Sequence, residues 1–210
     1  MQNVNTIGTR STTSPARVNG GSAESAPKHL RFTSDEYNRL AELGVFEGKR
    51  VELIEGELIE MAPMGPHHAV STFLAADVLR SIFVKGFFIS SQNQLDVDEN
   101  SQPEPDVAVV KGSPRDYSEF HPRTLVLAVE VSDSSLDFDR DVKSRIYAKA
   151  GIEDFWIVNL KDRCVEVFRR PVEDPNLGFI YSERVVFGED KAFAPLAKPK
   201  SKIKVADLLP

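Results

Sequence analysis

The sequence is poor in cysteine: Cys164 is the only one among 210 residues. A single thiol can form neither a disulfide framework within the chain nor a thiolate zinc site. We therefore interpret Cys164 as a packing residue and expect a reducing, cytoplasmic compartment. No stretch approaches the roughly 18 consecutive apolar residues that span a bilayer, so a membrane protein is not expected.

Positive charge is also in deficit, because 26 Lys and Arg stand against 32 Asp and Glu, a formal net charge of −6. Residues 1–29 carry a net charge of +2, which leaves −8 for the remaining residues. Non-specific coating of nucleic acid depends on a basic surface, so the overall charge argues against it. A local basic patch or an acidic metal pocket is compatible with the same charge.

Large apolar residues are scarce in residues 1–29, where Ser, Thr, Asn, Gly and Pro dominate. Such a segment buries too little to offset its ordering entropy, which predicts a disordered tail. It also lacks the apolar stretch of a secretory signal. Residues 30–210 have the length and composition of one compact domain, and no internal repeat divides them.

Three helices are predicted from capping signals and apolar spacing. The capping-box signature at residues 33–36 predicts a short helix through Leu43. A longer helix is predicted from Pro66 to a stop at Gly86. Its expected apolar face consists of Val70, Phe73, Leu74, Val78 and Ile82. A third helix is predicted over residues 139–151, and its expected buried stripe consists of Val142, Ile146 and Ala150.

Strand signals occur between and after these helices. Two short strands are predicted around Glu55-Gly56 and a hairpin around residues 161–163. The other predicted strands are a strand of mixed exposure in residues 87–98, Val107 to Val110, Thr124 to Val131, and residues 180–187. This order of elements predicts an α/β (α+β) fold with a mixed central β-sheet flanked by helices.

The run "LVLAVEVSD", residues 125–133, contains one carboxylate among apolar residues. In a strand, Leu125, Leu127, Val129 and Val131 would line one face, and Val126, Ala128 and Glu130 the other. An ionised carboxylate taken out of water without a partner costs several kcal/mol. Glu130 therefore needs a partner, or lies where the strand end reaches water.

Asp106 raises the same question, because it follows Pro105 at the mouth of the apolar strand Val107 to Val110. If this strand neighbours that of Glu130, the two carboxylates meet and repel each other unless a cation lies between them. Mg²⁺ needs only one or two carboxylates and keeps waters for a substrate phosphate. A metal site is therefore one interpretation, and two strand-end acids paired with nearby Lys or Arg are the other.

The helix that follows supplies a lysine. Lys143 and Tyr147 are four residues apart and share one helix face, beside the predicted apolar stripe. From there Lys143 can reach the acidic strand end, where it could hold a water nucleophile or stabilise charge on a phosphate. The alternative is an ordinary solvated lysine.

Five segments carry a resemblance: "VELIEGELIEMAP", "HH" at the head of a helix, "PEPDVAVV", "LAVEVSDSS" and "DRDVKSRIYAKAGIEDFWIVNL". In this order they resemble the Uma-two family of bacterial restriction-endonuclease-like proteins, once classed as a domain of unknown function. That family belongs to the PD-(D/E)XK nuclease superfamily. The resemblance covers roughly Arg31 to Arg170, and its specificity lies in the combination of the segments.

The resemblance implies a restriction-endonuclease-like PD-(D/E)XK core with Mg²⁺ or Mn²⁺ as cofactor. Pro105-Asp106 resembles the PD of the signature and Glu130 its second acid. The signature lysine would stand at residue 132, where this sequence has Ser132. In the family the lysine is displaced onto the next helix, which matches Lys143.

Two weaker correspondences follow from the same resemblance. Glu52 resembles an additional upstream acid, with a solvent-facing strand residue as the alternative. His68 resembles a polar position near the metal, whereas a helix-capping or surface role is the alternative for both His67 and His68. Tyr147 is a further weak candidate because it shares the face of Lys143.

These observations lead to the hypothesis of a metal-dependent DNA endonuclease. Asp106 and Glu130, with Glu52 as a further candidate, would hold one Mg²⁺ or Mn²⁺, and Lys143 would orient or activate the attacking water. One alternative is a catalytically inactive nuclease fold that serves as a binding or interaction module. A hydrolase of another phosphodiester is the other, since it would use the same residues.

A DNA-binding surface is the last expectation. The basic residues considered for it are Arg140, Lys143, Arg145, Lys149, Lys161, Arg163, Arg169 and Arg170. The alternative is a solvated face interleaved with Asp139, Asp141, Asp154 and Asp162. No base-reading motif accompanies them. Cleavage of both strands of a duplex would favour a homodimer, because a two-fold substrate matches a two-fold protein.

Overall fold

The computed structural model of the protein describes residues 28–210. The tail predicted over residues 1–29 lies outside the described residues except for its last two positions. Residues Arg31–Pro210 form one compact unit. No helix in the described part of the chain is long and apolar enough to cross a membrane.

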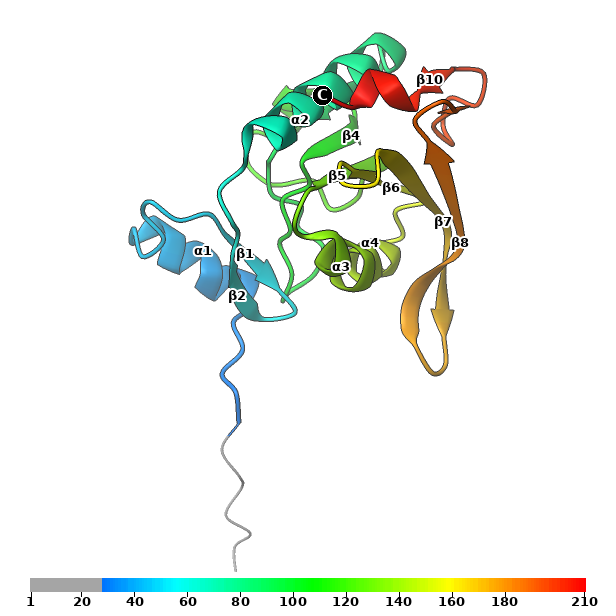
Figure 1. Ribbon diagram of the computed structural model, residues 1–210. Helices are drawn as coiled ribbons and strands as arrows, with labels where there is room; N and C mark the ends of the chain where they lie inside the picture. The colour runs from blue at the N-terminus through cyan, green and yellow to red at the C-terminus, as the bar shows by residue number, and fades with distance from the viewer. Residues whose placement is uncertain (1–27) are drawn as a thin grey trace, which may run out of the picture. The chain divides into compact units, whose positions relative to one another are not determined.

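A six-stranded mixed sheet forms the centre of this unit, in the order β3-β4-β5-β6-β7-β8 (Figure 1). Its strands are β3 (Phe87–Ser90), β4 (Val107–Lys111), β5 (Leu127–Ser132), β6 (Asp154–Asn159), β7 (Cys164–Asp174) and β8 (Gly178–Gly188). The pair β5–β6 is parallel, and all other neighbours are antiparallel. The predicted mixed sheet is confirmed, and the strands around residues 161–163 pair as the predicted hairpin.

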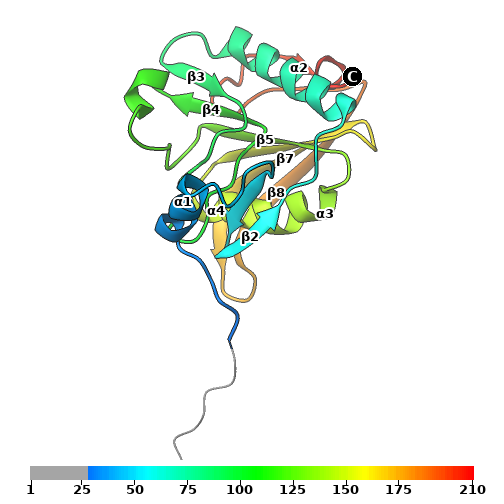
Figure 2. The same cartoon turned by 90° about the vertical axis from the view of Figure 1, so that its left-hand side faces the viewer.

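Helices cover both faces of the sheet (Figures 1 and 2). One face is covered by α2 (Pro66–Ile82) together with the C-terminal elements β9 (Ala192–Phe193), β10 (Ile203–Lys204) and the 3₁₀ helix η3 (Val205–Leu208). The other face is covered by α3 (Leu136–Phe138), the π-helical turn η2 (Asp139–Lys143) and α4 (Ser144–Lys149). A second 3₁₀ helix, η1 (Pro114–Tyr117), lies in the β4–β5 connection.

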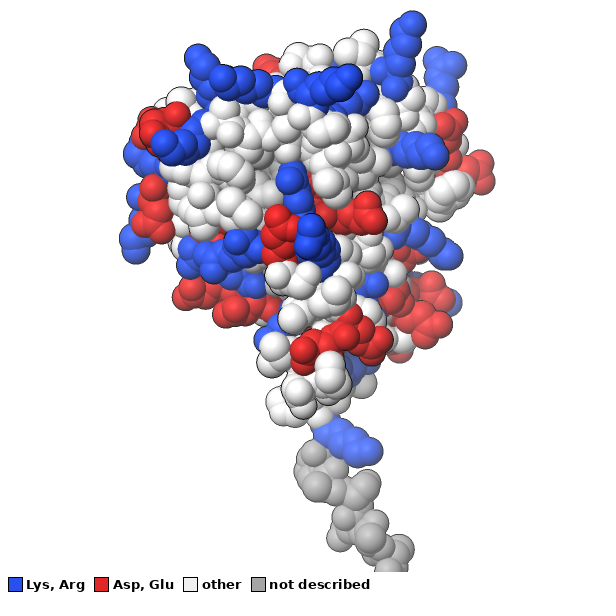
Figure 3. Space-filling model, turned by 90° about the vertical axis from the view of Figure 1, so that its right-hand side faces the viewer, with Lys and Arg blue, Asp and Glu red and all other residues white. Residues whose placement is uncertain are grey.

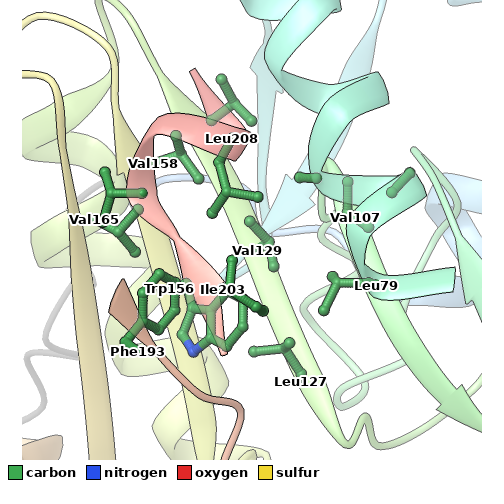
Figure 4. Packing of buried hydrophobic residues seen from close by; sticks show 14 of the residues in the cluster. Leu79, Val107, Leu127, Val129, Trp156, Val158, Val165, Phe193, Ile203 and Leu208 are labelled. Atoms are coloured by element: carbon green, nitrogen blue, oxygen red, sulfur yellow. The ribbon is translucent and has the colours of Figure 1, made fainter. Parts of the chain in front are cut away.

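Strand β5 is buried on both faces, as its apolar run predicts. Leu127, Val129 and Val131 belong to the core beneath α2, where Trp156 and Leu208 also pack (Figure 4). Ala128 belongs to the core beneath α4. Leu125 was expected on the same face as Leu127, but it precedes β5 and packs into the core beneath α4. The alternation therefore holds only within the strand itself.

The buried face of α2 differs from the predicted one. Val70 and Phe73, expected in the core, are 45% and 70% exposed. The buried residues are Ser71, Thr72, Ala75, Ala76 and Leu79. These mostly small side chains let the helix approach the sheet closely, and the Ser71 hydroxyl donates to the Leu208 carbonyl at 2.6 Å. Gly86 does not end the helix; it lies at φ +77° in the turn before β3.

This corrected face gives a stability prediction. Leu79→Ala is expected to lower the free energy of unfolding by about 3 kcal/mol, because Leu79 is fully buried and its removal leaves a cavity. Phe73→Ala removes a larger side chain but an exposed one, and is expected to change stability by less than about 1 kcal/mol. Urea unfolding of both variants measures the difference. Equal losses would mean that Phe73 packs against something in solution.

A small helix-and-hairpin unit precedes the sheet. It consists of α1 (Ser34–Glu42), β1 (Val51–Ile54) and the antiparallel β2 (Glu57–Glu60). The predicted capping box is present, with Thr33 as N-cap. The predicted turn is present too: Glu55 and Gly56 both have positive φ. The Tyr37 hydroxyl donates to the Val51 carbonyl at 2.7 Å, which fixes the helix on the hairpin.

Candidate active site

The two acids predicted at strand ends lie side by side. Strands β4 and β5 are antiparallel neighbours, with Val107 paired to Val129. Asp106 immediately precedes β4, and its Oδ2 accepts a hydrogen bond from the backbone N–H of Val131, the residue after Glu130, at 2.9 Å. Asp106 and Glu130 are each only 3% exposed. Their proximity follows from the pairing of β4 with β5, the condition on which the sequence analysis made the meeting of the two acids depend.

Lys143 is completely enclosed by this cluster. Its side chain is 2% exposed, and Nζ lies 3.0 Å from Glu130 Oε1 and 3.2 Å from Glu52 Oε2. The solvated alternative for this lysine is therefore wrong. Lys143 had been expected at the edge of the buried face, but it points to the centre of the site. Glu130 thus has a cationic partner thirteen residues further along the chain.

A π-helical turn places Lys143 in this position. Asp139–Lys143 form one π turn between α3 and α4, and the Ser144 N–H donates to the Asp139 carbonyl, five residues earlier. Of the predicted stripe, only Ile146 is buried, whereas Val142 and Ala150 are half-buried. A π turn holds an additional residue, so it changes which side chains point inward. Here the inward residues are Asp139 and Lys143 rather than Val142.

Ser132 stands where the superfamily signature has its lysine. It lies two residues after Glu130 in β5, so both side chains point to the same face of the sheet. A lysine at this position and Lys143 would both approach Glu130 from the face covered by η2 and α4. In this protein the amine beside Glu130 comes from Lys143.

Tyr147 also belongs to the cluster. Its hydroxyl donates to Glu130 Oε1 at 2.5 Å, and the side chain is fully buried. Burial and the neighbouring Glu130 carboxylate raise the pKa of Tyr147 well above its usual value, so the hydroxyl keeps its proton and acts as a donor. The four-residue spacing predicted that Lys143 and Tyr147 share a face, and both contact the same carboxylate oxygen.

Glu52 reaches the site from β1 and is fully buried. Besides Lys143, it accepts a hydrogen bond from the Glu104 N–H at 3.2 Å, and Arg50 lies 3.5 Å away. The solvent-facing alternative for Glu52 is therefore wrong. Its carboxylate is occupied by donors, which makes it a partner of Lys143 rather than a free ligand.

The two histidines at the start of α2 differ in environment. His67 is exposed, which fits the surface role. His68 is half-buried, and its Nε2 lies 3.1 Å from Asp106 Oδ2. Neither histidine caps the helix, because Gly65 occupies the N-cap position. The capping or surface role expected for His68 is wrong, since this ring contacts one of the two central acids.

Among the pocket residues that sequence reasoning missed are Asp139 and Arg50, which carry charges that act on the central acids. Asp139 is 2% exposed and accepts a hydrogen bond from the Ser135 hydroxyl at 2.7 Å. Its four-residue spacing from Lys143 was the available signal. Arg50 precedes β1 and has its guanidinium 3.3 Å from the carboxylate of Glu104. No sequence pattern pointed to Arg50, because the contact joins segments 54 residues apart.

The site has a strong excess of negative charge. Burial raises the pKa of Glu130 well above its usual value, and the carboxylates of Asp106, Asp139 and Glu52 add to this, although Lys143 opposes it. Burial alone would lower the pKa of Lys143, but the carboxylate of Glu130, followed by those of Glu52, Asp139 and Asp106, outweighs it and raises that pKa. Lys143 is therefore firmly protonated, while Glu130 is held in a setting that disfavours its charge.

Asp106 behaves differently from Glu130. Burial acts to raise its pKa, but the contact with His68, the charge of Lys143 and the hydrogen bond from Val131 lower it by more. The pKa of Asp106 thus lies below its usual value, and this carboxylate is ionised at neutral pH. Two neighbouring acids with oppositely shifted pKa values are typical of functional sites.

An open pocket leads to these residues. Its walls come from the β2–α2 loop, the residues after β5 and the π turn, and its lining includes Arg50, Met64, His68, Asp106, Glu130, Asp133, Ser135, Asp139 and Lys143. Asp106 and Glu130 both face this pocket, and two carboxylates are the donor set that Mg²⁺ or Mn²⁺ requires. Within residues 28–210, no group of three or more His, Cys, Asp and Glu side chains is arranged around a metal position. The residues present therefore fit a cation held by two carboxylates and water.

The basic residues expected to bind DNA are mostly neutralised. Lys143 is buried, and the others that form ion pairs are Arg140 with Glu166, Lys149 with Asp98, Arg163 with Glu189, Arg169 with Asp154 and Arg170 with Glu183. Arg140 and Arg184 bind the buried Glu166 from two sides. Most of these basic residues are therefore ion-paired, but of the four aspartates expected to lie among them only Asp154 forms one of these pairs.

The fold and the pocket define a nuclease-like α/β protein. The chain belongs to the Uma2 family, described as "Putative restriction endonuclease", whose model matches residues 34–199. It is similar in fold to a crystal structure from Anabaena variabilis described as a "putative nuclease belonging to DUF820", with a TM-score of 0.64 and 17% sequence identity. That match covers 84% of this chain and 97% of the other. No curated protein matches the sequence.

Proposed function

We propose that the protein is a metal-dependent DNA endonuclease that hydrolyses phosphodiester bonds in the pocket of Asp106 and Glu130. The observation that supports this most is the charge balance of the buried cluster. Four buried carboxylates, those of Glu52, Asp106, Glu130 and Asp139, act on the amine of Lys143, the only buried lysine among residues 28–210. Such an excess is unfavourable by itself, and a divalent cation at the mouth of the pocket would offset it.

The residues divide into those that face the pocket and those behind it. Asp106 and Glu130 would hold Mg²⁺ or Mn²⁺, which when bound polarises the scissile phosphate and lowers the pKa of water. Lys143 has an amine firmly protonated by its neighbours, so in this proposal it orients the attacking water and stabilises negative charge on the phosphate. Glu52 and Tyr147 hold Lys143 and Glu130 in place, and His68 fixes Asp106.

The proposal extends to the assembly and the compartment. Cutting both strands of a duplex favours a homodimer, because two sites related by a two-fold axis match the two antiparallel strands. The single cysteine suits a reducing cytoplasm. Size-exclusion chromatography with light scattering, with and without duplex, tests the dimer separately from the chemistry.

Plasmid cleavage tests the proposed chemistry. The purified protein is expected to nick and then linearise supercoiled plasmid in Mg²⁺ or Mn²⁺ but not in EDTA. A Glu130→Gln preparation purified in parallel controls for a contaminating nuclease. Binding of the cation is tested without turnover, because a ligand of the folded state raises the melting temperature, and Mg²⁺ should do so for the wild type only.

Three results would contradict the proposal. Cleavage that persists in EDTA would exclude the metal-dependent mechanism, and equal cleavage by Glu130→Gln would place the chemistry elsewhere. A folded protein that neither cleaves plasmid nor responds to Mg²⁺ would favour the binding or interaction module. Hydrolysis of a small phosphodiester, with plasmid left intact, would favour a different substrate.

A further inference from the structure

The C-terminal stretch from residue 191 to residue 204 has a charge opposite to that of the rest of the protein. The stretch, "KAFAPLAKPKSKIK", contains five lysines and no acid, so the remaining residues carry a net charge of −11. Lys200, Lys202 and Lys204 are exposed. Figure 3 shows Lys and Arg side chains along the upper edge of the molecule, at the height at which Figure 1 draws β10.

Lys191 pairs with the neighbouring Asp190, but the other four lysines of the stretch lack acidic partners. Lys149, Arg163 and Arg170 are each bound to a carboxylate. By contrast, within residues 28–210 no ion pair is formed by Lys198, Lys200, Lys202 or Lys204. The positive charge of these four lysines is therefore not neutralised by a neighbouring carboxylate, although the protein contains more acidic than basic residues.

Two more unpaired lysines lie beside this stretch. Lys198 Nζ lies over the rings of Phe83 and Phe87, 5.6 and 5.4 Å from their centroids. Phe87 is paired across the sheet with Lys111, and directly opposed residues of an antiparallel pair point to the same face. Lys85 lies in the turn between Phe83 and Phe87 and is exposed. Neither Lys85 nor Lys111 forms an ion pair with a carboxylate of the described residues.

The stretch is held in a defined shape rather than left loose. The Lys198 N–H donates to the Pro195 carbonyl at 3.0 Å, and the Ser201 N–H donates to the Lys198 carbonyl at 2.9 Å. Ile203 is buried in the core beneath α2, so Lys202 and Lys204 on either side of it project outward. The two contacts of Lys198 with aromatic rings fix its amine as well.

We propose that Lys85, Lys111, Lys198, Lys200, Lys202 and Lys204, here called the lysine surface, bind the phosphate backbone of duplex DNA. Amines that have no carboxylate partner are available to bind phosphates, and such contacts carry no sequence information. This inference rests on the proposed function and adds where the substrate duplex is held. It also explains how an acidic domain can retain a polyanion: the attraction is confined to one surface.

The test compares two variants of equal charge. The first replaces Lys198, Lys200, Lys202 and Lys204 with Gln, and the matched control replaces the ion-paired Lys49, Lys149, Arg163 and Arg170 with Gln. Fluorescence anisotropy with a labelled 30-bp duplex, in EDTA and over a range of salt concentrations, measures affinity without cleavage. Each lost phosphate contact lowers the slope of log K against log[salt] by about 0.9.

The first variant is expected to lose about 30-fold or more in affinity at low salt and about 3.6 in salt slope, whereas the control stays within about 3-fold of wild type. Equal losses in the two variants would overturn the lysine surface, since only net charge would then matter. Retained affinity for the duplex in the first variant would also overturn the lysine surface. So would binding of the wild type to anionic vesicles but not to the duplex. Thermal melting of both variants checks that they fold, and the exposed single change Lys200→Glu serves if the quadruple variant does not.

This result is separable from that of the proposed chemistry. Duplex binding that depends on the lysine surface, without any metal-dependent cleavage, would refute the endonuclease and leave the surface standing. Cleavage that depends on Glu130 but is unaffected by the four substitutions at several salt concentrations would refute the surface and leave the endonuclease standing.

Discussion

Lys143→Met is expected to lower the free energy of unfolding by about 3–5 kcal/mol at pH 8 and to abolish metal-dependent cleavage. Methionine fills nearly the same space as lysine, so the expected loss of stability comes from the missing positive charge. Removing one member of a buried ion pair leaves its partner uncompensated, which is among the costliest single changes. Here two partners, Glu130 and Glu52, lose the amine together.

The pH dependence of this loss has a definite sign. Lys143 is the main charge that opposes the rise in the pKa of Glu130, so its removal raises that pKa further. An acid whose pKa is higher in the folded than in the unfolded state binds protons preferentially when folded, so stability increases as pH falls. The deficit of Lys143→Met relative to wild type is therefore expected to be largest at pH 8 and to shrink towards pH 5.5.

Urea unfolding at several pH values measures this deficit. Lys149→Met is the matched control, because Lys149 lies on α4, which directly follows the π turn of Lys143, and pairs with Asp98 at a partly exposed position. That variant is expected to lose no more than about 1 kcal/mol, since exposed ion pairs contribute little. A pH-independent deficit for Lys143→Met would show that lost packing, rather than unpaired carboxylates, causes the destabilisation.

Local patterns in the sequence were sufficient for the central acids. Continuous apolar runs identified β4 and β5 as covered strands, and the position of Asp106 and Glu130 in those runs suggested that they meet. The spacing of Lys143 and Tyr147 then placed both on one helix face. Each of these inferences needs only the period of a strand or helix, which is a property of neighbouring residues.

The features that sequence reasoning did not predict, among them the burial of the candidate Glu52, depend on contacts between distant segments or on small irregularities. Glu52 is buried because the β1–β2 hairpin packs against the residues before Asp106, as the 3.2 Å bond from Glu104 N–H shows. The π turn shifts the helix face, so that Asp139 points inward and Val142 does not. In α2, hydrophobicity pointed to Phe73, but the buried face consists mostly of small side chains such as Ala75 and Ala76, with Leu79 as its one large residue.

Glu130→Gln is expected to have the opposite profile to Lys143→Met: cleavage falls by at least about 1,000-fold, while stability at pH 7 is unchanged within about 1 kcal/mol or increases. The glutamine amide has the size of the carboxylate. It carries no charge, and it binds a cation more weakly. Burial and three neighbouring carboxylates raise the pKa of Glu130, so the folded state disfavours its ionised form. Replacing it by a neutral group removes that cost, and Lys143 keeps Glu52 as its partner.

Steady-state plasmid nicking and urea unfolding on the same preparations separate the two effects, with Glu166→Gln as a control. Glu166 is equally buried, but Arg140 and Arg184 bind it outside the pocket, and its pKa is lowered by Arg140, Asn159 and Arg184 despite the opposing effect of burial. Glu166→Gln should therefore lose stability above about pH 4.5, where the wild-type carboxylate is ionised in both states. Glu166→Gln should retain plasmid cleavage at a temperature at which the variant is folded. If Glu130→Gln instead behaved like Glu166→Gln, Glu130 would be a structural ion-pair residue, and the negative cluster would have no catalytic role.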